Sequence, residues 1–510
     1  MITTGQEINR DIEESCDVCV VGSGAGGGAI AAELAEAGVD VVILEEGGYY
    51  TSRDFSTDPG VAVPQLYRES GSSVILGKPN IVFSEGRCVG GSTVINGGMC
   101  WRPPERVMQR WRWEMGLSGF TPENMAPLFE KVEQRINAAP QSPESLGRGD
   151  MLFKQAADKL GWLIHPNKRN QKDCTGEGVC VFGCPTDKKQ SVLITYIPRA
   201  LNNGARLYTD VKIQKVNTKN RIATGVEGKV LDRRTAKKTS HKLKVKAKSV
   251  VLAGGALQTP VMLMNSGVKC NGNVGRHFHC HPNVKVVGIF DEEVNYWKGV
   301  HQGHQVHQFI DEGILFAIGV VHPGLTALSF PQIGRDNLEL MELWNHMLVA
   351  GALVDDTTTG RIKKAPWGEP LAYYNIDHVE HERLIRSTAL LSQLLFTAGA
   401  RKVLLPFGSL EEIHGMDEIK KIYEARVSPE EMEVLTVHAL ATCRMGADPK
   451  RSVTSPWGEC WDVENLFIAD GSVVPSSLGV NPQETIMALA TRTGQYMLEN
   501  ENKYLKNRAL

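Results

Sequence analysis

"CDVCVVGSGAGGGAIAAELAEAGVDVVILEEGG", residues 16–48, is the stretch that decides the fold of this chain. Its "VCVVG" is a β-branched run, typical of a strand buried on both faces of a parallel sheet. An alanine-rich segment with helical spacing follows and stops at Gly38, a residue type that commonly ends helices. "VDVVIL" then predicts a second buried strand, so the stretch forms a complete β-α-β unit of an α/β fold.

Three glycines of this unit have the G-x-G-x-x-G spacing of a dinucleotide-binding turn. Gly22 permits the tight turn, Gly24 lets backbone amides approach a pyrophosphate, and Gly27 lets the helix pack closely on the strand. Glu45 ends the second strand, where a carboxylate would bond ribose hydroxyls. The spacing alone is a weak signal, but the complete unit predicts a dinucleotide site.

Later segments indicate which dinucleotide is bound. Gly90 and Gly91 lie in a second glycine-rich loop, "GRCVGGSTVINGG", residues 86–98. Ala253 opens a third strand–glycine element, and Asp470 closes another strand. Several separate segments converging on one cofactor suit a permanently held flavin adenine dinucleotide (FAD) better than an exchangeable nicotinamide.

Composition narrows the class of protein. A chain of 510 residues is too long for one ordinary core, and a net charge of −2 argues against a nucleic-acid surface. The N-terminus has no apolar signal core and no stretch reaches 18 apolar residues, so neither a signal peptide nor a transmembrane helix is expected. Eleven cysteines, an odd number, fit a reducing compartment. We therefore expect a cytoplasmic protein, with export on a partner chain left open.

The remaining pattern predicts helices and one antiparallel sheet. Residues 121–136 predict a helix with Thr121 as its N-cap, and residues 378–399 predict a long amphipathic helix. Residues 285–350 alternate short apolar runs with polar breaks, which is typical of antiparallel strands.

The motifs, taken together and in order, resemble the glucose–methanol–choline (GMC) oxidoreductases, a family of flavin-dependent alcohol oxidases and dehydrogenases. They are "VVGSGAGGGAIAAELAEAGVDVVILEEGG", "GRCVGGSTVINGG", "VVLAGGALQTPVMLMNSG", "GRHFHCHP", "VHALATCRMG" and "NLFIADGSVVPSSLGVNPQETIMALATR". Within the family, the chain looks most like the long-chain alcohol oxidase and cholesterol oxidase branches. One departure is Ala441, where many members carry glycine.

The resemblance implies a Rossmann-like FAD-binding domain interleaved with a substrate domain of antiparallel sheet and helices. We expect the FAD-binding domain to comprise residues 1–115, 190–285 and 426–510. The substrate-binding or cap region would then comprise residues 116–189 and 286–425.

The resemblance also implies site residues. His438, in "VHALATCRMG", would accept the hydroxyl proton of an alcohol, a task that suits a neutral imidazole. Asn481, in "GVNPQ", would hold the substrate oxygen. The further FAD contacts implied are Asp470 and Gly471 near the ribityl and pyrophosphate groups, Val211 near the adenine, and Gly90, Gly91 and Asn96 around the pyrophosphate and ring. His277, His279 and His281 in "GRHFHCHP" leave a metal cluster as a minority alternative.

A cysteine-rich loop, "DCTGEGVCVFGCPTDKK", occupies residues 173–189 and places Cys174, Cys180 and Cys184 in a C-x5-C-x3-C-P pattern. A structural zinc would need a fourth ligand, and a disulfide with a spare thiol fits a reducing compartment poorly. The spacing resembles that of flavin-dependent glucose dehydrogenase subunits, which carry a 3Fe–4S cluster. The resemblance therefore implies such a cluster on these three thiolates.

The resulting expectation is an FAD-dependent alcohol dehydrogenase that passes electrons through the cluster to an external acceptor, such as a cytochrome or quinone, with a small partner subunit left open. Two alternatives stay open: a clusterless oxidase that makes hydrogen peroxide, and a flavin electron-transfer subunit without a substrate of its own. A base beside the flavin argues against the second alternative, because a pure carrier has no use for it.

Overall fold

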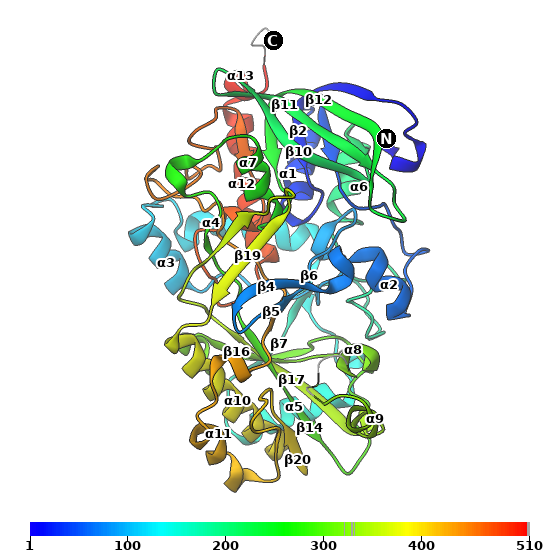
Figure 1. The fold of residues 1–510 in the computed structure, drawn as a ribbon, viewed down its shortest axis with the longest axis vertical. Helices are drawn as coiled ribbons and strands as arrows, with labels where there is room; N and C mark the ends of the chain where they lie inside the picture. The colour runs from blue at the N-terminus through cyan, green and yellow to red at the C-terminus, as the bar shows by residue number, and fades with distance from the viewer. Residues whose placement is uncertain (321, 328–329, 331, 507–510) are drawn as a thin grey trace.

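A computed structural model describes residues 1–320, 322–327, 330 and 332–506 of the chain. Figure 1 shows an elongated molecule with a β-sheet near each end of its long axis. The N-terminus and α13 (Glu501–Tyr504) lie at the end that holds the first sheet. The second sheet and helix α10 (His378–Ala398) lie at the opposite end.

The first sheet contains the β-α-β unit predicted for residues 16–48. β2 (Ile12–Val21), α1 (Ala25–Glu36) and β3 (Val41–Leu44) form it, and β2 pairs in parallel with both β3 and β12 (Lys238–Leu252). The prediction of this unit is thus confirmed. The remaining strands are β1 (Ile2–Thr3), β9 (Arg206–Tyr208), β10 (Val211–Lys219), β11 (Ile222–Leu231) and β23 (Leu466–Ile468).

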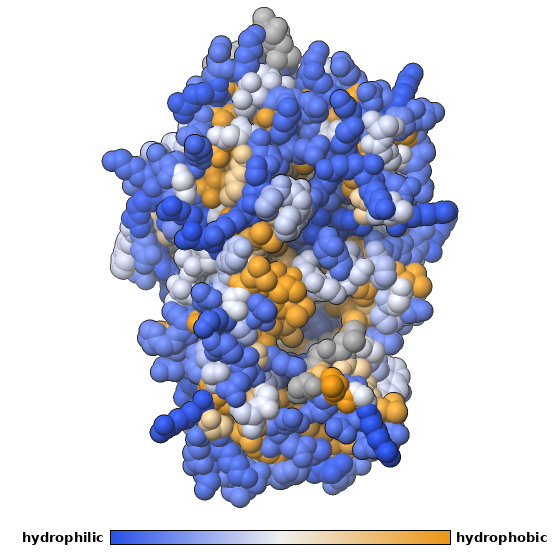
Figure 2. Space-filling model, viewed as in Figure 1, coloured by the Kyte–Doolittle hydropathy of each residue, from blue (hydrophilic) through white to orange (hydrophobic). Residues whose placement is uncertain are grey.

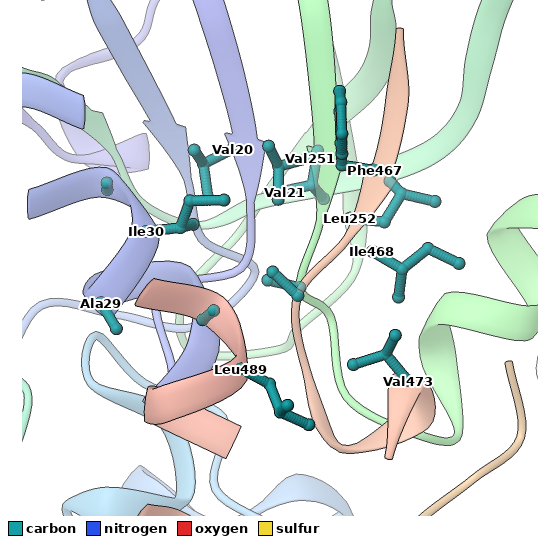
Figure 3. Packing of buried hydrophobic residues seen from close by; sticks show 14 of the residues in the cluster. Val20, Val21, Ala29, Ile30, Val251, Leu252, Phe467, Ile468, Val473 and Leu489 are labelled. Atoms are coloured by element: carbon teal, nitrogen blue, oxygen red, sulfur yellow. The ribbon is translucent and has the colours of Figure 1, made fainter. Parts of the chain in front are cut away.

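Helices cover the first sheet and bury its apolar strands. α12 (Gln483–Glu499) and α6 (Tyr196–Asn202) pack against α1. Figure 3 shows buried apolar residues of this half: Val20, Val251 and Phe467 on three adjacent strands, Ile30 on α1 and Leu489 on α12. The other helices of this half are α3 (Glu105–Glu114), α4 (Pro122–Arg135), α7 (Gln258–Asn265) and α13 (Glu501–Tyr504).

The second sheet is mainly antiparallel, and its strands come from distant parts of the sequence. In the described residues its order is β13 (Arg276–Phe278), β18 (Gly360–Lys364), β19 (Pro370–Asn375), β4 (Ser73–Lys78), β5 (Ile81–Phe83), β22 (Leu435–Thr436), β14 (Asn283–Ile289), β17 (Met347–Val354), β16 (Ile314–Ile318), β15 (His304–Val306) and β7 (Ile164–Pro166). β20 (Lys402–Leu404) also pairs with β14, and β21 (Glu412–Ile413) pairs with β20. α5 (Arg148–Lys159) and α10 pack against this second sheet. β6 (Ala138–Pro140) and β8 (Lys168–Asn170) form a separate pair.

Local signals explain the helices predicted in the cap region. The Thr121 hydroxyl accepts the Asn124 backbone N–H at 3.2 Å and caps α4. Asp377 and Glu380 form a capping box at the start of α10, and Gly399 ends it with a φ of +107°. Both predicted helices are confirmed, as are antiparallel strands within residues 285–350.

The chain passes repeatedly between the two sheets, which confirms the interleaved α/β fold. β4, β5 and β22 join the second sheet although they belong to segments expected in the FAD-binding domain. The exact domain boundaries stay a prediction. In the described part of the chain, no helix combines the length and apolar character that crossing a bilayer requires.

Candidate active site

A cavity of about 1590 Å³ is lined by residues from both sheets and by the glycine-rich loops. Figure 2 shows a hollow in the middle of one face, with hydrophobic residues gathered beside it. Every residue that the sequence suggested for FAD or for catalysis lines this cavity, except Gly27 and Gly90. Gly27 lies in the first turn of α1, and Gly90 lies in the second glycine-rich loop.

The first glycine-rich turn has no room for a side chain at Gly22 or at Gly27. Gly22 has a φ of +101°, and a Cβ on it would lie 2.1 Å from the Ala253 carbonyl oxygen. A Cβ on Gly27 would lie 2.0 Å from the Gly22 carbonyl oxygen. Only glycine fits these positions, so the start of α1 reaches the cavity as bare backbone. Bare amides at a helix N-terminus suit a pyrophosphate.

The second glycine-rich loop meets the first. A Cβ on Gly91, whose φ is +54°, would lie 2.9 Å from the Cα of Gly24. The Gly90 amide donates to the Ser23 hydroxyl at 3.1 Å. Two segments that are far apart in sequence thus form one backbone cradle, and its size and donors fit the diphosphate of FAD.

The protein itself uses more of the hydrogen-bond acceptor sites of Glu45 than the sequence suggested. Its Oε2 accepts the Ser23 amide at 3.0 Å and the Ser23 hydroxyl at 2.6 Å, and its Oε1 accepts the Gly47 amide at 2.8 Å. A carboxylate has about four acceptor sites, so roughly one stays available for a ribose hydroxyl. Glu45 therefore also fixes the first loop in place.

Asp470 joins the segment of Gly255 and Thr259 to its own turn. Its Oδ2 accepts from the Gly255 amide at 2.9 Å and the Thr259 hydroxyl at 2.5 Å. Its Oδ1 accepts from the amide and hydroxyl of Ser472. Burial raises the pKa of this carboxyl group. The neighbouring Gly471 lines the cavity, where a Cβ would lie 2.7 Å from the Ala439 carbonyl oxygen.

Asn96 and Val211 are also held by protein contacts. The Asn96 side-chain amide donates to Gln483 Oε1 at 2.8 Å, which ties the second glycine loop to α12. The Val211 amide donates to the Glu45 carbonyl oxygen at 2.8 Å. Both residues line the cavity as expected. These hydrogen bonds fix the orientation of the Asn96 side chain and of the Val211 backbone.

His438 and Asn481 come from two different segments in the C-terminal part of the sequence, and both line the cavity. His438 follows β22, is 8% exposed, and its Nδ1 lies 3.0 Å from Nδ1 of His281. Burial, followed by the adjacent His281 ring, lowers the pKa of His438 well below its usual range, so the ring is neutral. Asn481 precedes α12, and its Oδ1 is buried without a partner in the described residues. An unpartnered buried acceptor at a cavity wall fits a ligand donor.

His281 is a site residue whose importance the sequence did not reveal. Its segment, "GRHFHCHP", suggested structure or a metal cluster, and only folding shows that it contacts His438. His279 instead bonds Asp356 at 3.1 Å, and Asp356 also accepts the Cys280 amide at 2.9 Å. Within the described residues, the three histidines of this segment do not form a metal-binding group.

One other group has metal-like spacing: in the described part of the chain, ligand atoms of His281, Asp355 and Asp356 lie within 4.8 Å of one another. Protein donors already use them. Arg106 donates to Asp355 at 2.8 Å, and both ring nitrogens of His281 have protein partners. This group is a hydrogen-bond network, and we assign no metal to it.

Cys174, Cys180 and Cys184 line one small pocket that is separate from the main cavity. Arg169 approaches the Cys180 sulfur at 3.2 Å, and the Lys189 amide donates to the Cys184 sulfur at 3.4 Å. Burial alone would raise the pKa of Cys180, but the Arg169 and Lys189 cations outweigh it and lower the pKa. Neither cation could be recognised from the sequence, because no local pattern distinguishes Arg169 or Lys189 from the other basic residues of the chain.

The spacing of the three sulfurs excludes one of the alternatives. Among the described residues, they do not form a group within 4.8 Å, whereas thiolates sharing one tetrahedral zinc lie about 3.8 Å apart. A single zinc ion therefore does not fit this arrangement. All three cysteines are free thiols, so no disulfide is formed among them.

Comparisons with known proteins agree with this site. The family model described as GMC oxidoreductase matches residues 63–283 with its N-terminal part and 356–490 with its C-terminal part. An uncharacterized GMC-type oxidoreductase of Mycobacterium tuberculosis is 35% identical over 476 residues, which cover 93% of this chain and 74% of the relative. A long-chain-alcohol oxidase of Arabidopsis thaliana is 30% identical, over 96% of this chain and 68% of the relative.

Solved structures match the whole fold. Pyridoxine 4-oxidase from "Mesorbium loti" aligns with a TM-score of 0.72 at 18% identity, over 95% of this chain and 99% of that one. Formate oxidase aligns with a TM-score of 0.74 at 13% identity, over 96% of this chain and 99% of that one. With the glycine cradle, the family model and relatives that match more than nine-tenths of the sequence in agreement, this chain belongs to the FAD-dependent GMC oxidoreductase family.

Proposed function

We propose that this protein oxidises an alcohol to an aldehyde or ketone. One observation carries the proposal: His438 and Asn481 come from separate segments and line the cavity onto which both glycine loops open. FAD held on those loops would supply the acceptor for the hydride that leaves the alcohol carbon. A hydroxyl group can both donate and accept, and the two side chains offer a ring nitrogen and an amide to bind it.

The protein's own groups would bind and orient both molecules. The backbone cradle of Gly22, Gly24 and Gly91 would hold the diphosphate, and the remaining acceptor site of Glu45 would take a ribose hydroxyl. Asn481 would fix the substrate oxygen so that the reacting carbon faces the cofactor. His438 would bond the same oxygen from the other side.

The cavity wall favours an apolar alcohol. Val74, Val82 and Val437 line it and are 48%, 52% and 55% exposed, along β4, β5 and the residue after β22. Exposed apolar side chains at a pocket mouth suit an alkyl chain. The likeness to a long-chain-alcohol oxidase supports the same substrate class.

We also propose that Cys174, Cys180 and Cys184 hold a 3Fe–4S cluster. Two contacts support it: N–H groups of Arg169 and Lys189 approach sulfurs of the loop, and hydrogen bonds to sulfur tune such clusters. A cluster would supply one-electron transfer to a cytochrome, quinone or other carrier. Without it, the same site would act as an oxidase that makes hydrogen peroxide.

Two measurements test these proposals. The first mixes the FAD-loaded protein anaerobically with 1-dodecanol and follows loss of the oxidised flavin absorbance. We expect His438→Ala to keep its FAD but to lose reduction about 100-fold or more. Reduction that survives in this variant contradicts the role of His438, whereas wild-type protein that no alcohol reduces contradicts the alcohol oxidation.

The second measurement assays iron and acid-labile sulfide per flavin in anaerobically purified protein, with Cys180→Ser as the matched variant. Iron and sulfide in the wild type that are lost from the variant support the cluster. Near-zero iron in the wild type removes the cluster and leaves the oxidase.

A further inference from the structure

The hydrogen bonds around His281 have a direction that the backbone fixes. The amides of Leu478 and Gly479 point at Nε2 of His281, at 3.0 and 3.2 Å. A backbone N–H group can only donate, so Nε2 of His281 must be the acceptor and carries no proton. This assignment needs no assumption about either ring.

The position of the proton on His281 follows. His281 is fully buried, and burial lowers the pKa of its ring despite nearby carboxylates, so the ring is neutral. A neutral imidazole holds one proton, and with Nε2 accepting, that proton is on Nδ1. Nδ1 of His281 therefore donates to the nitrogen 3.0 Å away, Nδ1 of His438.

The same reasoning then applies to His438. Its Nδ1 is an acceptor, and its ring is neutral, so its proton is on Nε2. Nε2 of His438 has no hydrogen-bond partner within the part of the chain that the structure describes, and the residue lines the cavity. The chain of donors thus runs from the backbone through two histidines and ends in the cavity.

We propose that His281 is a positioning residue that holds His438 in its Nε2–H tautomer, so that His438 meets the substrate oxygen as a hydrogen-bond donor and not as a base. The inference rests on the proposed alcohol oxidation and revises the base role that the sequence suggested. Asn481 complements this role, because its unpartnered Oδ1 can accept a hydrogen bond from the O–H group of the alcohol. One donor and one acceptor together match an alcohol.

The proton balance then differs from that of a base mechanism. The O–H bond of the alcohol breaks and its proton passes to solvent water, because the cavity opens to the surface beside the exposed Val437. The alkoxide oxygen that forms accepts the Nε2–H of His438. As the carbonyl bond then forms, the C–H bond breaks, and FAD, when bound, would take the hydride with its electron pair. A fixed donor aimed at developing negative charge in a partly desolvated site stabilises the transition state.

The backbone donors are themselves held in place. Gly479 has a φ of +67°, and a Cβ on it would lie 3.2 Å from the carboxylate carbon of Asp355. Asp355 accepts from Arg106 at 2.8 Å and from the Ser477 hydroxyl at 2.5 Å, which fixes the loop before Gly479. A loop held in this way keeps the two amides aimed at His281. It therefore keeps the direction of donation in the series of hydrogen bonds from the backbone through His281 to His438.

Two substitutions at one position separate the donor role from mere packing. His281→Gln keeps the direction, since its amide oxygen can accept from the backbone while its NH₂ donates to His438. His281→Glu offers only acceptors when ionised, and so draws the His438 proton to Nδ1. Retained FAD shows that each variant is folded.

The decisive readout is ¹⁵N NMR of histidine-labelled holoenzyme, with the His438 signal assigned by its loss in His438→Gln. We expect Nε2–H on His438 in the wild type and His281→Gln, and Nδ1–H in His281→Glu. We expect 1-dodecanol to reduce the flavin at similar rates in the first two, and about 100-fold slower in the third.

A wild-type His438 with its proton on Nδ1 would overturn the inference. So would a His281→Glu protein that has the switched tautomer and reduces its flavin as fast as the wild type, because that is the behaviour of a base. Failure of the proposed function looks different: no alcohol would then reduce the flavin of the wild-type protein, whichever nitrogen of His438 carries the proton.

Discussion

Removing the Asp470 carboxylate should release the segments that it joins, and the structure gives the size of the effect. Asp470→Ala deprives two backbone amides of their acceptor, the buried one of Ser472 and the partly buried one of Gly255. Each buried donor left unpaired costs about 1–3 kcal/mol, so the free energy of unfolding should fall by about 2–6 kcal/mol. The Thr259 and Ser472 hydroxyls can rotate to other acceptors, and we add nothing for them.

Asp470→Asn provides an intermediate case. Its amide oxygen can still accept on one side, while its NH₂ faces a donor on the other, so one backbone amide loses its partner. We expect a loss of about 1–3 kcal/mol. Asp448→Ala is the matched control, because Asp448 is exposed and accepts only the Lys450 amide at 2.8 Å. Such a surface change should stay within about 0.5 kcal/mol.

Urea unfolding followed by tryptophan fluorescence measures all three variants, and the flavin-to-protein absorbance ratio measures FAD retention. The free energy of unfolding should decrease in the order Asp448→Ala, Asp470→Asn, Asp470→Ala. The fraction of protein that retains FAD should decrease in the same order. An Asp470→Ala protein within about 1 kcal/mol of the wild type, with FAD bound, would refute the idea that this carboxylate holds the site together.

Three more changes test other parts of the structure. Gly91→Ala places a methyl group 2.9 Å from the Gly24 Cα at a φ of +54°, so the purified protein should contain much less FAD by absorbance. Burial would raise the pKa of Glu46, but Arg68 outweighs it and lowers the pKa from 4.5 to about 2. Its ion pair therefore stabilises the fold by about 3 kcal/mol above pH 4.5, and Glu46→Gln should lose this at pH 7 but not near pH 2 in urea titrations. Phe467→Ala empties a fully buried position and should cost about 3–5 kcal/mol in the same assay, whereas an unchanged midpoint would refute the packing.

Much of the first sheet was predictable because its signals are local. The β-branched runs, the helix that follows and the glycine spacing all fall within residues 16–48, and no distant contact is needed to interpret them. The caps of α4 and α10 are similarly local. The second sheet was predicted only as a type, because short strands such as β5 and β22 have too few residues to show alternation.

The candidate site was predicted where motifs carry it and missed where packing creates it. His438 and Asn481 were found through the family resemblance. The contact between His281 and His438 joins residues 157 positions apart and depends on how β14 and β22 pair, which no local pattern encodes. Arg169 was missed for the same reason, since only the fold places it beside Cys180.

The place of β23 in the first sheet has a consequence for synthesis of the protein. β23 covers residues 250–252 of β12, yet it leaves the ribosome more than 200 residues later. At typical elongation rates the end of β12 waits roughly 10–40 s for this neighbour. During that time an apolar strand edge is open to wrong partners. Cofactor loading is therefore a late event, and nascent chains of this protein are candidates for chaperone protection.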